Sequence, residues 1–137
     1  MIKESAVDAS FISLKTICSN SISGISEYWG ASRQELTKIP AGENILDVGC
    51  ANGEFMQLAK QNGFNAYGVE ANEFTADIAK KNGLNVFKGT LEEAHFKDNY
   101  FSAIYLGDIL EHVTDPIALL KECKRILKKE GIIVVST

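Results

Sequence analysis

The stretch that decides the fold is residues 45–55, Ile-Leu-Asp-Val-Gly-Cys-Ala-Asn-Gly-Glu-Phe. It begins with a short apolar run that contains Asp47 and closes on a glycine, which is typical of a buried parallel strand. Gly49 and Gly53 allow a tight turn in which bare backbone comes close to a ligand. A helical apolar pattern then starts at Phe55. Strand, glycine turn and helix in this order indicate a site for a nucleotide-type cofactor.

Two kinds of cofactor compete for this turn. A dinucleotide needs the spacing G-x-G-x-x-G, but counting from Gly49 puts Ala51 and Glu54 at the second and third glycine positions. Glu54 would also place negative charge where a pyrophosphate binds. Asp47 instead suits a cationic or amine-bearing cofactor such as S-adenosylmethionine, with its ammonium and sulfonium. The alternative is that Asp47 only bonds the amides of the glycine turn.

Residues 47–53, Asp-Val-Gly-Cys-Ala-Asn-Gly, resemble motif I of the class I S-adenosylmethionine-dependent methyltransferases, usually D-x-G-x-G-x-G. Ala51 replaces the middle glycine, and this departure is tolerated if Ala51 keeps a negative φ. The resemblance runs from about Tyr28 to Thr137. It implies S-adenosylmethionine as the cofactor, a small-molecule methyl acceptor, and an α/β fold: a doubly wound, parallel, Rossmann-like sheet with strand order 3-2-1-4-5.

Composition and charge fit one domain over residues 1–137, with an N-terminal helical segment at 1–40 and a core at 41–137. The net charge of −4 does not indicate a protein that binds nucleic acid or an anionic membrane. No apolar run approaches the roughly 20 residues of a membrane span. The cysteines Cys18, Cys50 and Cys123 form neither a disulfide framework nor a zinc pattern, which favours a reducing, cytoplasmic setting. We expect Cys50 to pack rather than react.

Alternating patterns and turn signals predict the other elements. Two helices are expected before the core, at about 11–22 and 27–38. In the core, the predicted strands are 65–70, 84–88, 101–106 and 132–135, and the predicted helices are 73–81 and 116–130, the last ended by Gly131.

Glu70 ends the second predicted core strand, 23 residues after Asp47, where an acid can accept hydrogen bonds from both ribose hydroxyls. The alternative is a solvated charge at a strand end. Relatives often carry Gly-Asp after the next strand, with the Asp near the adenine amino group, but here Thr90 follows Gly89. The adenine contact is therefore unassigned, with the backbone of residues 90–91 or the side chain of Glu92 as candidates.

The resemblance also implies a full set of cofactor contacts. Tyr28, before the first core strand, is one candidate, although with Trp29 it could equally be a packing anchor. The contacts implied are Asp47, Gly49, Cys50, Ala51, Gly53, Glu70, Ala71, Thr90, Leu91, Gly107, Asp108 and Tyr28.

Residues 107–112, Gly-Asp-Ile-Leu-Glu-His, resemble motif IV and its continuation, often D-V-L-E-H. For an oxygen nucleophile, His112 suits a general base, the alternative being a hydrogen-bonded loop residue. Asp108, Glu111 and His112 would share one face of a helix, so a divalent metal site is a second interpretation. The protein itself needs no nucleophilic side chain, because positioning and desolvation can supply much of the catalysis of methyl transfer.

The pattern stops at the fifth core strand, which leaves a rival interpretation: a cofactor-binding domain or fragment without independent activity. Ile132–Val135 would then form a hydrophobic sheet edge without charge or proline. We therefore expect a truncated form of a longer protein, or a homo-oligomer joined through the 132–136 edge. In the structure, a partner or a folded-back N-terminal helix should lie against that edge.

Overall fold

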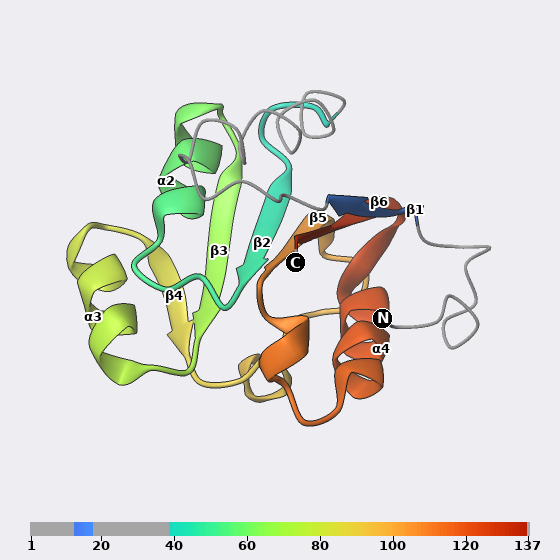
Figure 1. Cartoon of the computed structure of the whole chain (residues 1–137). Coiled ribbons are helices and arrows are strands. Elements are labelled where there is room, and N and C mark those ends of the chain that lie inside the picture. Colours follow the sequence, from blue (N-terminus) through green and yellow to red (C-terminus); the bar gives the residue numbers. More distant parts are fainter. Residues whose placement is uncertain (1–12, 18–38, 137) are drawn as a thin grey trace.

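A parallel sheet forms the centre of the molecule, in a computed structural model that describes residues 13–17 and 39–136 (Figure 1). The strands are β1 (Ser13–Ile17), β2 (Asn44–Val48), β3 (Asn65–Glu70), β4 (Asn85–Lys88), β5 (Phe101–Gly107) and β6 (Leu127–Ser136). The helices are α2 (Glu54–Gln61), α3 (Glu73–Lys81) and α4 (Pro116–Ile126), with short 3-10 turns η3 (Glu92–Ala94) and η4 (Leu110–His112). None of the helices in this described part is long and apolar enough to cross a membrane.

The strands lie in the order β1-β6-β5-β2-β3-β4, and every neighbouring pair is parallel. Counted from β2, the five core strands have the order 3-2-1-4-5, so the predicted doubly wound topology is confirmed. Because β2 lies between β3 and β5, the glycine turn that follows it sits in the middle of the sheet's carboxyl edge. Ligands of open α/β sheets bind at that edge.

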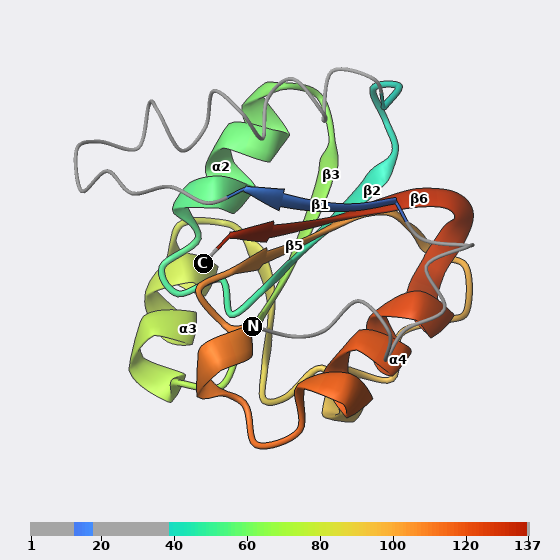
Figure 2. The ribbon, with the colours of Figure 1, turned by 45° about the vertical axis from the view of Figure 1, so that its right-hand side comes forward.

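Alternate residues of each strand serve two different cores, one on each face of the sheet. Ile45 of β2 packs with Ala59 of α2, whereas its neighbour Leu46 packs in the larger cluster that contains Leu120 and Ile126 of α4. Figure 2 shows α4 set apart from α2 and α3. The helices thus cover both faces and leave the carboxyl edge as the accessible side.

The N-terminal segment lies against β6 as predicted, but as a strand rather than a helix. Ser13 pairs with Ile132 and Ile17 with Ser136, in parallel register. The helical expectation for 11–22 was wrong here because the open edge of β6 offers backbone donors and acceptors that outweigh a weak helical pattern. The helix predicted at 27–38, and Tyr28 within it, lie outside the described residues.

The end of α4 also differs from the prediction. The helix stops at Ile126, and Leu127 is already extended and paired with Phe101. The register then shifts, so that Ile132 pairs with Ala103. Gly131 therefore does not end a helix. Pairing with β5 makes Leu127 extended, so the helix predicted to residue 130 is four residues shorter.

Gly68 in β3 is a position where the packing leaves no room for a side chain. A Cβ there would lie 2.7 Å from Sγ of Cys50 and would clash with Sδ of Met56. We predict that Gly68→Ala lowers the free energy of unfolding by about 1–3 kcal/mol, the usual range for overpacking a core. Urea denaturation measures this loss.

A second substitution at Met56 provides the control. Because Met56→Ala removes the clashing atom, the loss in the double variant should be smaller than the sum of the two single losses. Strict additivity, or a neutral Gly68→Ala, would contradict the crowding argument.

Candidate functional site

A cavity of about 510 Å³ lies at the carboxyl ends of β2, β3, β4 and β5. Each of these strands contributes its last residue or the turn after it. The opposite wall comes from η4 and the start of α4. The lining residues are Val48, Gly49, Val69–Ala71, Gly89–Glu92, Gly107–Ile109, His112–Asp115, Ala118 and Leu119.

Most of the predicted site residues meet in this cavity, but some do not line it. Those in the lining are Gly49, Glu70, Ala71, Thr90, Leu91, Gly107, Asp108 and His112. Four others do not line the cavity but belong to β2 and the glycine turn that follows it: Asp47, Cys50, Ala51 and Gly53. The reasoning from sequence missed the wall made by residues such as Ile109, Val113 and Ala118, because tertiary packing, rather than a local signal, brings them to the cavity.

The end of β3 holds the glycine turn through three successive amides. The amides of Gly49 and Cys50 donate to the carbonyl oxygen of Val69, at 2.8 and 3.0 Å. The amide of Ala51 donates to Oε2 of Glu70 at 2.8 Å, and Oε1 of the same carboxylate accepts from the amide of Asn72 at 3.0 Å. Glu70 is thus more than a solvated strand-end charge, because it joins the turn to the start of α3.

Ala51 adopts a left-handed conformation, with φ of 49°. The expectation of a negative φ was therefore wrong. A residue with a Cβ costs roughly 1–2 kcal/mol in this region compared with the right-handed one. The hydrogen bond from its amide to Glu70 helps to hold it there.

Gly53 meets a steric requirement of the fold itself. Its φ is 89°, and a Cβ there would clash with Cδ1 of Leu84 and lie 3.5 Å from Cβ of Ala79. A side chain at position 53 would therefore point towards Ala79 of α3 and Leu84. This packing alone explains why glycine precedes α2.

Asp47 is a buried carboxylate without a hydrogen-bond donor among the described residues. Its residue surface is only 4% exposed, and it points to the face opposite Leu46 and Val48. Burial, and to a lesser extent the charge of Glu70, raise the pKa of this carboxyl well above its ordinary value. The alternative in which Asp47 bonds the turn amides does not hold, because Glu70 accepts from the turn instead.

Cys50 lies under the turn as a packed side chain. It is 5% exposed, and burial together with the charges of Asp47 and Glu70 raises the pKa of its thiol to about 12. A thiol with such a pKa carries almost no thiolate at neutral pH. The expectation that Cys50 packs in the core is confirmed, and its lack of reactivity stays a prediction.

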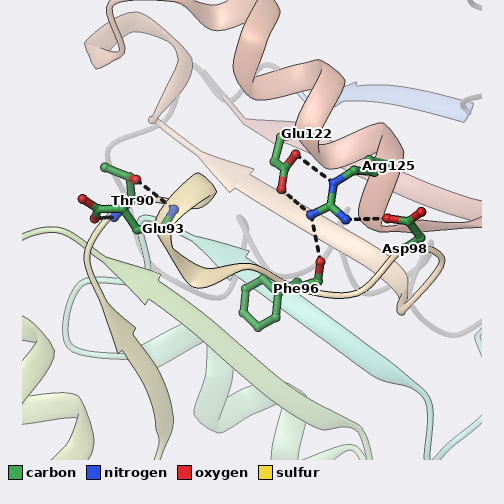
Figure 3. A network of polar contacts seen from close by, with 6 residues as sticks. All are labelled: Thr90, Glu93, Phe96, Asp98, Glu122 and Arg125. Atoms are coloured by element: carbon green, nitrogen blue, oxygen red, sulfur yellow. Dashed lines mark hydrogen bonds and ion pairs between the residues drawn. The ribbon is translucent and has the colours of Figure 1, made fainter.

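The segment after β4 is fixed by a reciprocal pair of hydrogen bonds. The amide of Thr90 donates to Oε2 of Glu93 at 2.9 Å, and the amide of Glu93 donates to Oγ1 of Thr90 at 3.3 Å (Figure 3). This arrangement is a capping box. Its signature, Thr-x-x-Glu, is present in the sequence but was not recognised from it. The hydroxyl of Thr90 is thereby engaged within the turn.

Arg125 of α4 fixes the far end of the same segment. Its guanidinium donates to the carbonyl oxygen of Phe96 at 2.8 Å and forms ion pairs with Asp98 and Glu122 (Figure 3). Residues 90–98, which include one wall of the cavity, are therefore tied at both ends.

The segment with Asp108 and His112 is not a continuous helix. Asp108 has a left-handed φ of 51°, and only Leu110–His112 form a 3-10 turn. His112 is exposed and lies 3.9 Å from the Glu111 carboxylate, which does not line the cavity. Within the described residues, no group of three or more His, Cys, Asp or Glu side chains is arranged to hold a metal ion, these three included.

The lining of the cavity is acidic. It contains the carboxylates of Glu70, Glu92, Asp108 and Asp115, whereas no Lys or Arg is found among the described lining residues. The buried Asp47 directly precedes Val48 and Gly49, which are both part of this lining. Such a surface favours a cationic ligand over an anionic one.

The buried Asp47 makes the stability of the ligand-free protein depend on pH. Because its pKa is raised on folding, the folded state binds this proton more tightly than the unfolded chain. Stability should therefore decline as the pH rises from about 4, the ordinary value for Asp, towards the pKa of the folded state. We predict that Asp47→Asn flattens this decline and raises the free energy of unfolding at pH 7.

Urea denaturation at a series of pH values between 4 and 8 measures the effect. Glu54→Gln, at an exposed position on α2, is the control for removing one negative charge. If Asp47→Asn shows the same pH dependence as the unmodified protein, Asp47 is not a destabilising buried carboxylate.

Comparison with known proteins connects this site to one family. Residues 23–137 match the family described as methyltransferase domain. A ubiquinone biosynthesis O-methyltransferase from Actinobacillus pleuropneumoniae is 30% identical over 107 residues, which cover 70% of this chain and 46% of that protein. The chain thus spans about half the length of the curated relatives it matches.

Solved structures show the same fold. A SAM-dependent methyltransferase from Archaeoglobus fulgidus superposes with a TM-score of 0.66 at 26% identity, covering 79% of this chain and 50% of that one. Phosphoethanolamine N-methyltransferase 2 from Haemonchus contortus, in complex with S-adenosyl-L-methionine, gives 0.75 at 20% identity, covering 82% and 28%. With the match over residues 23–137, these findings establish that the chain belongs to the methyltransferase domain family of class I S-adenosylmethionine-dependent methyltransferases.

Proposed function

We propose that this chain binds S-adenosylmethionine and that its site transfers the methyl group to an oxygen atom of a small-molecule acceptor. The observation that carries the proposal is the acidic cavity at the glycine turn, with Glu70 in its lining and the buried Asp47 next in sequence to the lining residue Val48. The cofactor supplies an activated methyl group on a positively charged sulfur.

The described residues fit the parts of this cofactor. Asp47 is an orphaned buried carboxylate, which a nearby ammonium or sulfonium would compensate. Glu70 has four lone-pair positions and uses two of them for amides, so it retains capacity for the ribose hydroxyls. Gly49 lines the cavity and allows its backbone to approach the ligand.

The same features disfavour a dinucleotide. A pyrophosphate needs cations or free amides at the helix N-terminus. Here the amides of residues 49–51 donate to the end of β3, and Glu54 lies in the first turn of α2. An acidic lining would repel the phosphates further.

The acceptor side of the cavity supports an oxygen nucleophile. Ile109, Val113 and Leu119 give it apolar surface, which excludes water. His112 lies in the same lining and is exposed, so its imidazole can take a proton from an acceptor hydroxyl. Several relatives of about 30% identity are named O-methyltransferases.

A second candidate is cofactor binding without independent methyl transfer. It is favoured by one observation, the coverage of about half of the curated relatives. In that case the cavity would bind S-adenosylmethionine, and methyl transfer would need further residues around the acceptor.

Calorimetric titration with S-adenosylmethionine and with NAD tests the cofactor assignment. We expect heat of binding only with S-adenosylmethionine; binding of NAD alone would overturn the proposal. A methyl-transfer assay with a labelled cofactor and a set of phenols, catechols and amines then separates the two candidates. Binding with no transfer to any acceptor would favour the binding domain.

The role proposed for Glu70 can be tested by substitution. Loss of its hydrogen bonds to the ribose should weaken cofactor binding by about 1.5–3 kcal/mol in Glu70→Ala, the range for hydrogen bonds to a charged group. Glu70→Gln retains an oxygen for the amide of Ala51, and the loss should be smaller. Calorimetry gives the affinities.

Glu73→Ala provides the matched control, because this nearby carboxylate is exposed and pairs with Lys88 on the surface. Since Glu70 also holds the glycine turn, denaturation curves should accompany each titration. Unchanged affinity in a folded Glu70→Ala protein would remove Glu70 from the cofactor site.

The role proposed for His112 can be tested in the same way. If it acts as general base, His112→Asn should lower the rate of methyl transfer roughly 10²–10⁴-fold and leave cofactor affinity unchanged.

The other histidine, His95, is the control, because it does not line the cavity and has a left-handed φ that asparagine tolerates. His95→Asn should keep the full rate. Full activity in His112→Asn would return His112 to a structural role, and a chelator added to the same assay tests the metal interpretation.

We further propose a reducing, cytoplasmic setting, supported by Cys50 and Cys123, which are both free thiols in the core. Association into a homo-oligomer stays a prediction. The sheet edge that prompted it is paired with β1 in this structure.

A further inference from the structure

The methionine part of S-adenosylmethionine carries a carboxylate as well as an ammonium, so the function proposed above, on which this inference rests, requires a donor for that carboxylate. The amides of residues 49–51 are engaged with the end of β3, and the amide of Gly53 donates to the carbonyl oxygen of Cys50 at 2.9 Å. No Lys or Arg belongs to the described lining of the cavity. Among the described residues, the donor must therefore be a neutral group outside the glycine turn.

Tyr105 lies beside Asp47 on the same face of the sheet. The two residues are paired in register on the neighbouring strands β5 and β2, and neighbouring strands lie about 4.8 Å apart. The residues on either side of Tyr105, Ile104 and Leu106, belong to the core cluster that includes α4, so the tyrosine side chain points to the face covered by α2. Asp47 and Tyr105 thus place an acceptor next to a donor.

The ring of Tyr105 leans along β5 towards the carboxyl end of the strand. It stacks on Phe55 of α2, with ring centroids 4.3 Å apart and an interplanar angle of 14°. A Cβ placed on Gly107, two residues further along β5, would lie 2.7 Å from Cε1 and 3.0 Å from the hydroxyl oxygen of Tyr105. Because Gly107 lacks a side chain, the ring has room there, and its hydroxyl is held next to a residue that lines the cavity.

We propose that the hydroxyl of Tyr105 donates a hydrogen bond to the carboxylate of the methionine part, while Asp47 compensates the ammonium. One carbon atom carries both charged groups of this amino acid, so they can face a donor and an acceptor that lie on adjacent strands. A hydrogen bond from a hydroxyl to a carboxylate is charge-assisted and roughly twice as strong as one between neutral groups. Tyr105 therefore selects a cofactor with an intact amino acid over one that has lost its carboxyl group.

The test uses decarboxylated S-adenosylmethionine, which retains the adenosyl group, the sulfonium and the amine but lacks the carboxylate. Calorimetry, or competition against labelled cofactor, gives the affinity of each compound for the unmodified protein and for Tyr105→Phe, which removes the hydroxyl and keeps the stacked ring. We expect Tyr105→Phe to weaken binding of S-adenosylmethionine roughly tenfold or more. Binding of the decarboxylated compound should change by less than about twofold, because it makes no hydrogen bond to Tyr105.

Tyr67→Phe is the matched control, because it removes a hydroxyl from the other side of the sheet. Tyr67 is paired in register with Leu46 and so lies on the face opposite Asp47, where its hydroxyl is 2.9 Å from that of Tyr100. This variant should keep both affinities. A loss of equal size for the two compounds in Tyr105→Phe, or no loss at all, overturns the inference and leaves the proposed function standing. Failure of the unmodified protein to bind S-adenosylmethionine overturns both.

Discussion

Three consecutive amides of the glycine turn donate to the end of the neighbouring strand, and the geometry of the whole site depends on this contact. Two of them share the carbonyl oxygen of Val69, and the third uses the carboxylate of Glu70. Hydrogen bonds within the protein therefore fix the shape of the turn. It also holds Ala51 in a conformation that alanine seldom adopts. A binding site formed in this way needs little reorganisation when a cofactor arrives.

Stability and binding make opposite demands on Asp47. A carboxylate with 4% exposure and no donor among the described residues is costly for folding, and a neutral side chain would serve the core better. In the proposed cofactor site, an ionised Asp47 next to the acidic cavity would strengthen the attraction for a cation, because the dielectric constant there is low. Functional sites commonly retain such local conflicts between sequence and fold.

The parts of the fold that local signals determine could be predicted from the sequence. α3 has the predicted bounds because Asn72 caps its start and Asn82-Gly83 follows its end. The strand ends that carry Gly49, Glu70 and Gly107 follow from hydrophobic runs closed by glycine or an acid. The conformation of the N-terminal segment and the end of α4 could not be predicted in this way, because pairing with a distant strand decides both. The second wall of the cavity was missed for the same reason, since tertiary packing brings α4 to the sheet.

The pairing of β1 with β6 has a consequence for the order of folding. These two strands lie at opposite ends of the chain, with Ser13 beside Ile132. On the ribosome the earlier strand leaves the exit tunnel long before its partner has been synthesised. The β2–β5 sheet can form from contacts of shorter sequence separation, so closure by β1 should be a late event with a large loop entropy to overcome. Until then, β6 would present an open hydrophobic edge, and recognition of that edge by another chain would compete with completion of the fold.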